Sequence, residues 1–198
     1  SGEYADHSSE PPSAKTLSVF KDPNAVKRTV SDISWYPDGG KKLAVAFAIM
    51  QFQDWRMEKM SNLSYIWDVN NPNFPEQDLT PSSPLCCLEY NPKDPHLLVG
   101  GSYNGLISYW DTRKGDIPAD TSIIEKSHRD PVYDIAWLQG KTAFECASTS
   151  TDGQVSRSPP HPTHHHHHRP SQRPLGMASP PLGRQVLWWD IRKLGEPS

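Results

Sequence analysis

Three copies of a short aromatic strand that ends in Trp-Asp constrain the fold of this chain more than any other feature. The copies carry the pairs Trp67 and Asp68, Trp110 and Asp111, and Trp189 and Asp190. A second apolar run precedes each copy, at 30–35, 85–90 and 132–137. Recurring units of this kind are typical of repeat proteins, in which each unit buries its apolar face against the next one.

The spacing of the copies indicates the kind of repeat. Asp68 and Asp111 are 43 residues apart, within the ~40–45 residues of a four-stranded WD40 propeller blade. Short apolar runs alternate with turn signals such as Asn104-Gly105 and Asp152-Gly153, which tolerate the positive φ of tight hairpins. No apolar pattern at helical spacing persists. The sequence therefore predicts an all-β fold, a WD40 β-propeller fragment of about three blades.

Composition divides the chain into four parts. Residues 1–15 are polar and are predicted to be a linker or tail, and residues 16–155 hold the WD40 blades. Residues 156–185 contain seven prolines and a run of histidines, so we predict a disordered, Pro/His-rich low-complexity insertion. Residues 186–198 form the end of the third blade. Without the insertion the flanking residues read as one continuous turn and strand, so we interpret the insertion as a translated intron or an artefact of the gene model.

Charge and composition exclude several classes of protein. Lys and Arg number 20 against 23 Asp and Glu, which argues against a nucleic-acid binder that depends on phosphate contacts. No apolar run approaches the ~20 residues of a membrane span, and no secretory signal is apparent. Three cysteines are too few for a disulfide framework or an isolated Cys₄ zinc site, so we expect reduced, packed thiols. We therefore expect no nucleic-acid partner and no membrane.

Local sequence strings point to one family of WD40 proteins. The chain resembles the dynein intermediate chains over about 11–155 and 186–198, and departs from their pattern within 48–63. The strings that carry the resemblance are Pro12–Thr16, Lys42–Ala46, Ser64–Asp68, Pro81–Leu85, Tyr103–Gly105, Trp110–Gly115 and Ser127–Tyr133.

The resemblance implies a role in assembly. In that family the propeller is a non-catalytic scaffold that helps attach the heavy chains of the ciliary outer dynein arm to one another and to the axoneme. The implied partners are dynein heavy chains, a second dynein intermediate chain and dynein light chains, with axonemal microtubules as indirect partners. The implied locations are the cytoplasm, the cytoskeleton and the cilium axoneme. Neither an enzymatic activity nor a cofactor is implied.

Five polar or aromatic residues match the buried hydrogen-bond network that links the loops and strands of a WD40 blade. By resemblance, the network consists of His128, Ser148 or Ser150, Asp152 and Trp189. A catalytic Ser-His-Asp group is the alternative interpretation, but no nucleophile elbow accompanies these residues, and the blade already explains them. Asn104 stands in the second copy where the third has Asp152, so we expect a weaker network or none in that blade.

Two further motifs have alternative functional interpretations. His161 and the run at 164–168 include side chains that bind metals in a free peptide, but no surrounding frame is evident, so we predict no metal site. Trp-Asp-x-Arg occurs at 110–113 and 189–192 and resembles the motif of WD40 substrate receptors of cullin-type ubiquitin ligases. The simpler interpretation is that each arginine pairs with acidic residues at the blade edge, and the ligase receptor remains the alternative function.

Overall fold

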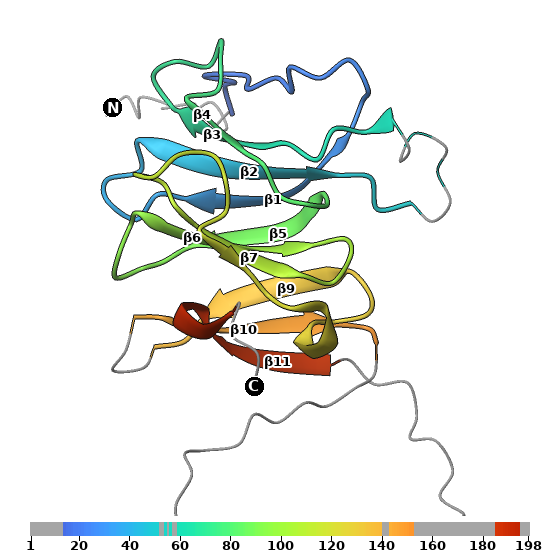
Figure 1. Cartoon of the computed structure of the whole chain (residues 1–198). Coiled ribbons are helices and arrows are strands. Elements are labelled where there is room, and N and C mark those ends of the chain that lie inside the picture. Colours follow the sequence, from blue (N-terminus) through green and yellow to red (C-terminus); the bar gives the residue numbers. More distant parts are fainter. Residues whose placement is uncertain are drawn as a thin grey trace, which may run out of the picture.

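Eleven strands form three antiparallel sheets that stack on one another in the computed structural model (Figure 1). The structure describes residues 14–51, 54, 56, 59–139, 143–152 and 185–194, without the side chains of 185–188. The prediction of an all-β propeller fragment of three blades is confirmed within this part of the chain. The predicted Pro/His-rich insertion at 156–185 lies outside the described residues except for Gln185, which begins the last strand.

Within each blade the strands follow sequence order across the sheet. Blade 1 consists of β1 (Thr29–Trp35), β2 (Lys42–Ala48), β3 (Ser64–Asp68) and β4 (Gln77–Leu79). Blade 2 consists of β5 (Leu85–Tyr90), β6 (Leu97–Ser102), β7 (Ile107–Asp111) and β8 (Asp120–Thr121). Blade 3 consists of β9 (Val132–Trp137), β10 (Glu145–Ser150) and β11 (Gln185–Asp190). Within the described residues, the 3₁₀ helices η2 (Ile124–Lys126) and η3 (Ile191–Lys193) follow β8 and β11.

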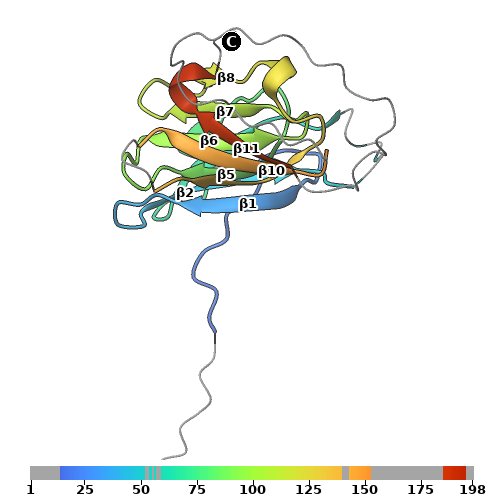
Figure 2. The ribbon, with the colours of Figure 1, turned by 90° about the horizontal axis from the view of Figure 1, so that it is seen from below.

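The first strand of each blade is its inner strand. β1 lies against β5, and β5 lies against β9, whereas β1 and β8 lie at opposite edges of the stack when it is seen from below (Figure 2). We call the face of a blade that points toward its N-terminal neighbour the near face, and the opposite face the far face. Among the described residues, no helix is long and apolar enough to cross a membrane.

Each inner strand contains a β-bulge at the same position of the repeat. The pairing register shifts between Val30 and Asp32 in β1, between Leu85 and Cys87 in β5, and at the equivalent place opposite Thr149 and Ser150 in β9. A bulge inserts one extra residue, so the side chains beyond it point to the opposite faces of the sheet from those they would otherwise occupy. This explains why apolar residues recur at intervals of three and then two in these runs, rather than at the strict interval of two of a regular strand.

The blades bury their apolar residues against one another in two interfaces. Between blades 1 and 2, the small far-face residues Ala44 and Ala46 receive the bulky near-face residues of blade 2, of which Leu88, Tyr90 and Trp110 are at most 4% exposed. A second cluster joins blades 2 and 3. Its central members are Cys87, Val99, Ile107, Val132, Ile135, Trp137 and Trp189.

Hydrogen bonds tie each inner strand to the next one. The Asp32 carboxylate accepts the Leu88 N–H at 2.9 Å, and the Ser34 hydroxyl accepts the Tyr90 N–H at 3.0 Å. One blade further on, Glu89 accepts the Trp137 N–H at 2.8 Å, and the Glu89 carbonyl accepts the Trp137 indole N–H at 3.0 Å. The bonds of Ser34 to the Tyr90 N–H and of Glu89 to the Trp137 N–H lie at equivalent positions, so both interfaces share this part of the register.

Residues 20–28 cover the outer part of the near face of blade 1. Phe20 packs edge-on against Trp67 with ring centroids 5.5 Å apart. The buried Arg28 guanidinium binds both oxygens of Asp22 at 2.9 and 2.8 Å and lies 4.8 Å above the Phe47 ring. Because the arginine also donates to backbone carbonyls of residues 61 and 63, this charged pair has the additional hydrogen bonds that a buried ion pair needs.

All three cysteines are buried and unpaired, as the sequence analysis predicted. Burial raises the pKa of the Cys86 and Cys146 thiols to about 12, and it raises the pKa of Cys87 as well, with the neighbouring Cys86 as a second cause. Near neutral pH these thiols are therefore protonated and behave as small apolar side chains in the blade interfaces.

A substitution at Gly105 tests the close contact between blade 2 and the loop that contains His128. It has φ +86°, and a Cβ there would lie 2.0 Å from the His128 carbonyl oxygen. Gly39 has φ +80° but nothing within 4 Å of its Cβ position, so it is a matched control for backbone strain alone. We expect Gly39→Ala to cost about 1 kcal/mol and Gly105→Ala about 3 kcal/mol, because overpacking adds to the strain. Urea unfolding followed by tryptophan fluorescence measures both, and equal losses would contradict the close approach.

Glu89 generates a prediction about pH. Burial raises the pKa of its carboxyl, the Trp137 N–H lowers it, and Asp134 and Asp32 raise it. A carboxyl whose folded pKa is raised stabilises the fold below its unfolded pKa, and that contribution is lost as pH rises through the folded pKa. We therefore expect Glu89→Gln to be more stable than the parent chain at pH 7, with the advantage vanishing below the ordinary value of 4.5. Thermal melts across this range measure it, with Glu125→Gln on exposed η2 as the control.

Candidate functional site

A buried hydrogen-bond network joins three segments of blade 3. His128 lies in the loop before β9, Ser148 in the middle of β10 and Trp189 near the end of β11. The Trp189 indole N–H donates to the Ser148 hydroxyl at 2.6 Å, and His128 Nε2 lies 2.8 Å from the same oxygen. His128 Nδ1 lies 3.4 Å from Asp152 Oδ2, which also accepts the Arg129 N–H at 2.8 Å.

The donors and acceptors of this network form one consistent chain. Because the indole N–H of Trp189 can only donate, the Ser148 oxygen is its acceptor, and the hydroxyl proton is free to point at His128 Nε2. Nδ1 then carries the proton and faces the Asp152 carboxylate. This assignment follows from the hydrogen-bond pattern. It satisfies Ser148 and both ring nitrogens of His128 inside a region that solvent does not reach.

The structure distinguishes between the two serines that the sequence analysis left open. Ser148 takes part in the network, whereas the Ser150 hydroxyl donates to the Asp130 carbonyl at 3.2 Å. All five residues named from the sequence therefore lie in the same region of blade 3, but the contact to Trp189 and His128 belongs to Ser148. We propose that the five residues have a structural role and hold the loop before β9 against β10 and β11.

Ser148, His128 and Asp152 also have the connectivity of a catalytic triad. Two observations argue against catalysis. The Ser148 and His128 residues are 0% and 3% exposed, so a substrate has no access to the hydroxyl. The hydroxyl oxygen is also occupied by the Trp189 N–H. A cavity nearby is lined by residues that include Asn104, Ile124 and His128, but the His128 side chain is 0% exposed to solvent.

Register explains why blades 1 and 2 lack this network. Ser148 pairs with the residue two positions before Trp189. The equivalent residue is Gly100 in blade 2 and Val45 in blade 1, and neither has a hydroxyl group. In blade 2 the Trp110 indole N–H donates instead to the Asp116 carbonyl at 3.0 Å, and in blade 1 the buried Trp67 indole nitrogen has no partner.

The aspartates of the three Trp-Asp pairs each close a turn. Asp68, Asp111 and Asp190 accept the backbone N–H two residues further on, at 2.9, 3.2 and 3.1 Å. This is the local bond by which Asp favours turns. The tryptophans meanwhile are buried in the blade, at 1%, 0% and 8% exposure in chain order. The Trp-Asp pair therefore couples a core side chain to the end of a strand.

The arginines of the two Trp-Asp-x-Arg motifs bind the aspartates of their own motifs. Arg113 holds Asp111 at 2.7 and 2.9 Å, and Arg192 holds Asp190 at 2.8 and 2.5 Å. These hydrogen bonds lower the pKa of both carboxyls. Pairing with the aspartate of the turn therefore accounts for an arginine at this position, and binding to a ligase adaptor is not needed to explain it.

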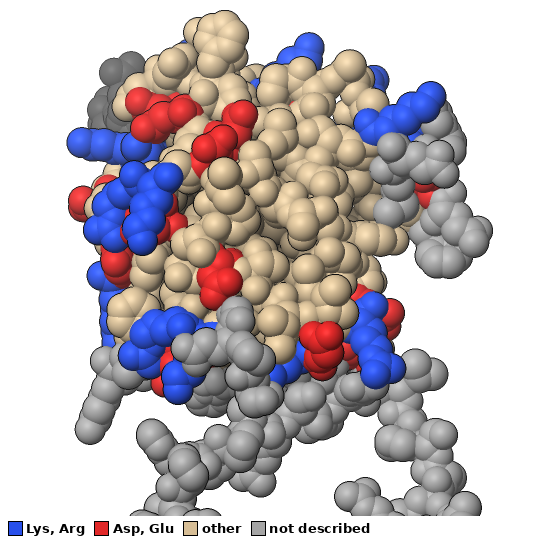
Figure 3. All heavy atoms as spheres, viewed as in Figure 1, with Lys and Arg blue, Asp and Glu red and all other residues tan. Residues whose placement is uncertain are grey.

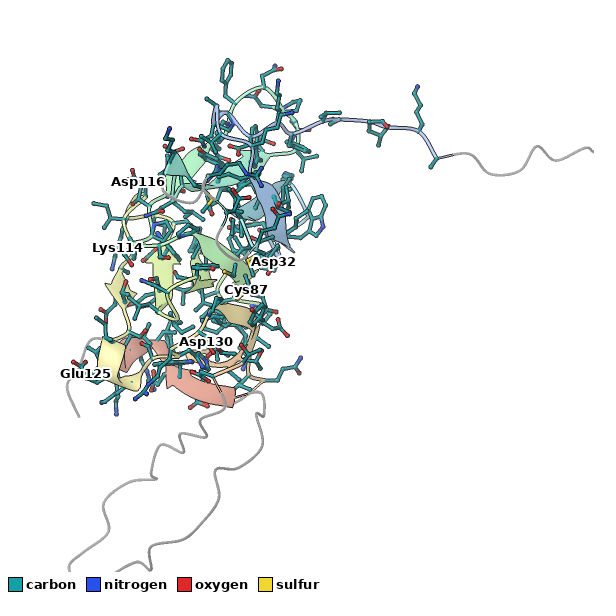
Figure 4. The ribbon with its side chains drawn as sticks, turned by 90° about the vertical axis from the view of Figure 1, so that its right-hand side faces the viewer. Asp32, Cys87, Lys114, Asp116, Glu125 and Asp130 are labelled. Carbon is teal, nitrogen blue, oxygen red and sulfur yellow. The ribbon has the colours of Figure 1, made fainter. Side chains whose placement is uncertain are left out.

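Exposed apolar side chains lie on the outer side of the blades. Phe74 follows β3, Ile117 lies between β7 and β8, and Ile124 begins η2, with exposures of 74%, 74% and 77%. We call these three the rim residues. Figure 4 shows Asp116 and Glu125, the sequence neighbours of Ile117 and Ile124, on the side away from Asp32 and Cys87 of the inner strands. Figure 3 shows a broad area without charged side chains on this face, with charges of both signs at its left and lower margins.

The described residues contain no group of three or more His, Cys, Asp or Glu side chains that could hold a metal ion. His161 and the histidine run at 164–168 lie outside the described residues.

The network yields a prediction with an internal control. Ser148→Ala leaves the Trp189 indole N–H and His128 buried without their shared partner, so we expect a loss of about 2–4 kcal/mol in the free energy of unfolding. Ser102 is equally buried, but its hydroxyl has no partner. We therefore expect Ser102→Ala to change stability by less than about 0.5 kcal/mol. Urea titration measures both, and similar losses would show that Ser148 contributes only packing.

Comparison with known proteins places this architecture in a family. The family described as "Dynein axonemal intermediate chain 3 WD40 domain" matches residues 13–116. Dynein axonemal intermediate chain 2 of Rattus norvegicus is 53% identical over 96% of this chain and 25% of the relative. The ciliary dynein intermediate chain 3 of Heliocidaris crassispina is 51% identical over 96% of the chain and 26% of the relative.

A more distant relative is the 70 kDa intermediate chain of the flagellar outer arm dynein of Chlamydomonas reinhardtii. It is 45% identical over 96% of this chain and 28% of the relative. The chain thus spans about a quarter of the length of these curated relatives. The matched residues include the Trp-Asp strands of the first two blades, and the chain belongs to the WD40-repeat family of axonemal dynein intermediate chains.

Proposed function

We propose that this chain is part of a non-catalytic scaffold subunit of the ciliary outer dynein arm, which supports assembly and attachment of dynein heavy chains for microtubule-based ciliary movement. The observation that carries the proposal is the 45% identity to an intermediate chain of a flagellar outer arm. The proposed partners are dynein heavy chains, a second dynein intermediate chain and light chains, with axonemal microtubules contacted indirectly. The proposed location is the cilium axoneme, reached from the cytoplasm.

The surface of the molecule is consistent with a binding role. The rim residues expose large apolar side chains on three connections between strands of the propeller, and such side chains serve as anchors in protein–protein interfaces. By contrast, the Ser-His-Asp group of blade 3 is closed to substrates. We therefore assign binding to the rim and the exposed loops, and a structural role to the buried network.

A pull-down from ciliated cells tests this proposal against the ligase alternative. We expect the tagged chain to recover dynein heavy chains and a second intermediate chain. We expect the paired change Phe74→Asp and Ile117→Asp to reduce that recovery about tenfold or more, because a charge at an apolar anchor costs at least ~1.4 kcal/mol of binding. Leu17→Asp is the control, since Leu17 is 90% exposed but lies in the segment before blade 1.

The ligase alternative makes the opposite prediction. A cullin adaptor would be recovered in place of dynein subunits, and Arg113→Ala together with Arg192→Ala would abolish that recovery. This outcome would overturn the scaffold proposal. Recovery of dynein subunits that is unaffected by the rim changes would instead place the binding surface elsewhere on the chain.

A further inference from the structure

The hairpin that joins β10 to β11 has the same strand pairing as the hairpin that joins β6 to β7. Asp111 pairs with the first residue of β6, and Asp190 pairs with the first residue of β10. In both hairpins the pairing then runs along the strands without a register shift. The residues of β11 from Val186 onward therefore occupy the positions of their counterparts in β7 from Ile107 onward.

The two hairpins differ in the connection between their strands. In blade 2 the Ser102 N–H donates to the Leu106 carbonyl at 2.9 Å, so a turn of three residues joins the strands. The turn ends at Gly105 with φ +86°, as is usual for a three-residue hairpin with a glycine in the left-handed region. In blade 3, Ser150 pairs with Gln185, and 34 residues of the sequence separate the two.

A Gln-Val pair occurs at both ends of this longer connection. Gln154-Val155 stands near its beginning, and Gln185-Val186 follows 31 residues later. Three residues separate Ser150 from the first glutamine, as in the turn of blade 2. A chain without residues 155–185 would therefore present Gln154 to Ser150 in place of Gln185, and every other pair between β10 and β11 would stay unchanged.

The distance from the turn glycine to the Trp-Asp pair gives the same length for the excess. Gly105 precedes Asp111 by six residues, whereas Gly153 precedes Asp190 by 37. The difference is 31 residues, which equals the offset between the two Gln-Val pairs. One measure depends on the comparison with blade 2 and the other does not, yet both mark a segment of the same length.

A buried carboxylate oxygen lacks the partner that a three-residue turn supplies. Asp152 stands at the position of Asn104, whose Oδ1 accepts the N–H of Leu106, two residues further on, at 3.3 Å. Asp152 Oδ2 accepts the Arg129 N–H, but Oδ1 is buried without a partner among the described residues. In a three-residue turn, the residue two positions beyond Asp152 is fixed by its pairing with Ser150. Its N–H then lies where Oδ1 can accept it, as in blade 2.

We propose that residues 155–185 interrupt a three-residue hairpin of blade 3, and that a natural form of this protein lacks them. In that form Gln154 takes the position of Gln185, which is the same residue type, and β11 keeps its register and its place in the blade. Asp152 retains its contact with His128 and gains a partner for its second oxygen. The inference goes beyond the scaffold function and does not depend on it.

Deletion of residues 155–185 tests the effect on the blade. Because the cost of closing a connection rises with its length, we expect the equilibrium constant for folding to be about tenfold larger, or more, than in the parent chain. Urea unfolding followed by tryptophan fluorescence measures it. Deletion of 156–185 and deletion of 154–185 are matched controls, since they leave one residue more or one residue fewer before Trp189. We expect both controls to lose most of the gain, because a shift of one residue changes the turn or the register.

Asp152→Ala in the parent and in the shortened chain tests the role of the carboxylate. The substitution removes the Arg129 contact in both chains, but only the shortened chain also loses the bond to Oδ1. We therefore expect it to lower the folding equilibrium constant about fivefold more in the shortened chain than in the parent. Equal effects in the two chains would contradict the three-residue turn.

Peptide sequencing of the natural protein from ciliated cells tests whether the shorter form exists. Trypsin cleaves after lysine and arginine, so the shorter form yields a peptide that begins at Thr142, passes directly from Gln154 to Val186 and ends at Arg192. We expect this junction peptide. The proposal is overturned if only the peptide from Thr142 to Arg157 is recovered, if the shortened chain is no more stable than the parent, or if a control deletion is as stable as the deletion of 155–185.

Discussion

Packing of each inner strand on the preceding blade is the constraint on which the rest of this structure depends. A four-stranded sheet has two faces and cannot bury both by itself, so a blade is stable only beside another blade. Here small side chains on one far face receive Leu88 and Tyr90 of the next near face. Hydrogen bonds from Asp32 and Ser34 set the register of that contact. The second interface uses Glu89 for the same purpose.

The bulge in each inner strand makes this packing possible. It brings two apolar residues that are three positions apart, such as Ile135 and Val132, onto the same face. Without the extra residue, a strand of this composition would place one of them on the opposite face. The bulge is therefore present in the inner strand of all three blades, and the recurring interface depends on it.

The polar network of blade 3 uses, in a structural role, the same residue types that form a catalytic triad in hydrolases. Ser148, His128 and Asp152 are connected as in a hydrolase, yet the group is sealed and its serine oxygen accepts from Trp189. The hydrogen bonds among these groups contribute to a unique packing arrangement, although Asp152 Oδ1 is buried without a partner. Blades 1 and 2 lack the hydroxyl at this position and show two different outcomes, a backbone acceptor for Trp110 and no acceptor for Trp67.

The sequence by itself determined the fold class, the strands and the Trp-Asp turns, because a repeat near 43 residues, alternating apolar runs and turn residues such as Asn104-Gly105 are local properties of the chain. It also named the residues of the network. Only the tertiary structure decided between Ser148 and Ser150, since that choice depends on register with β11. It also decided that Trp35 is exposed while Tyr90 is buried, because burial depends on which surface packs against a strand, and local sequence does not encode that neighbour.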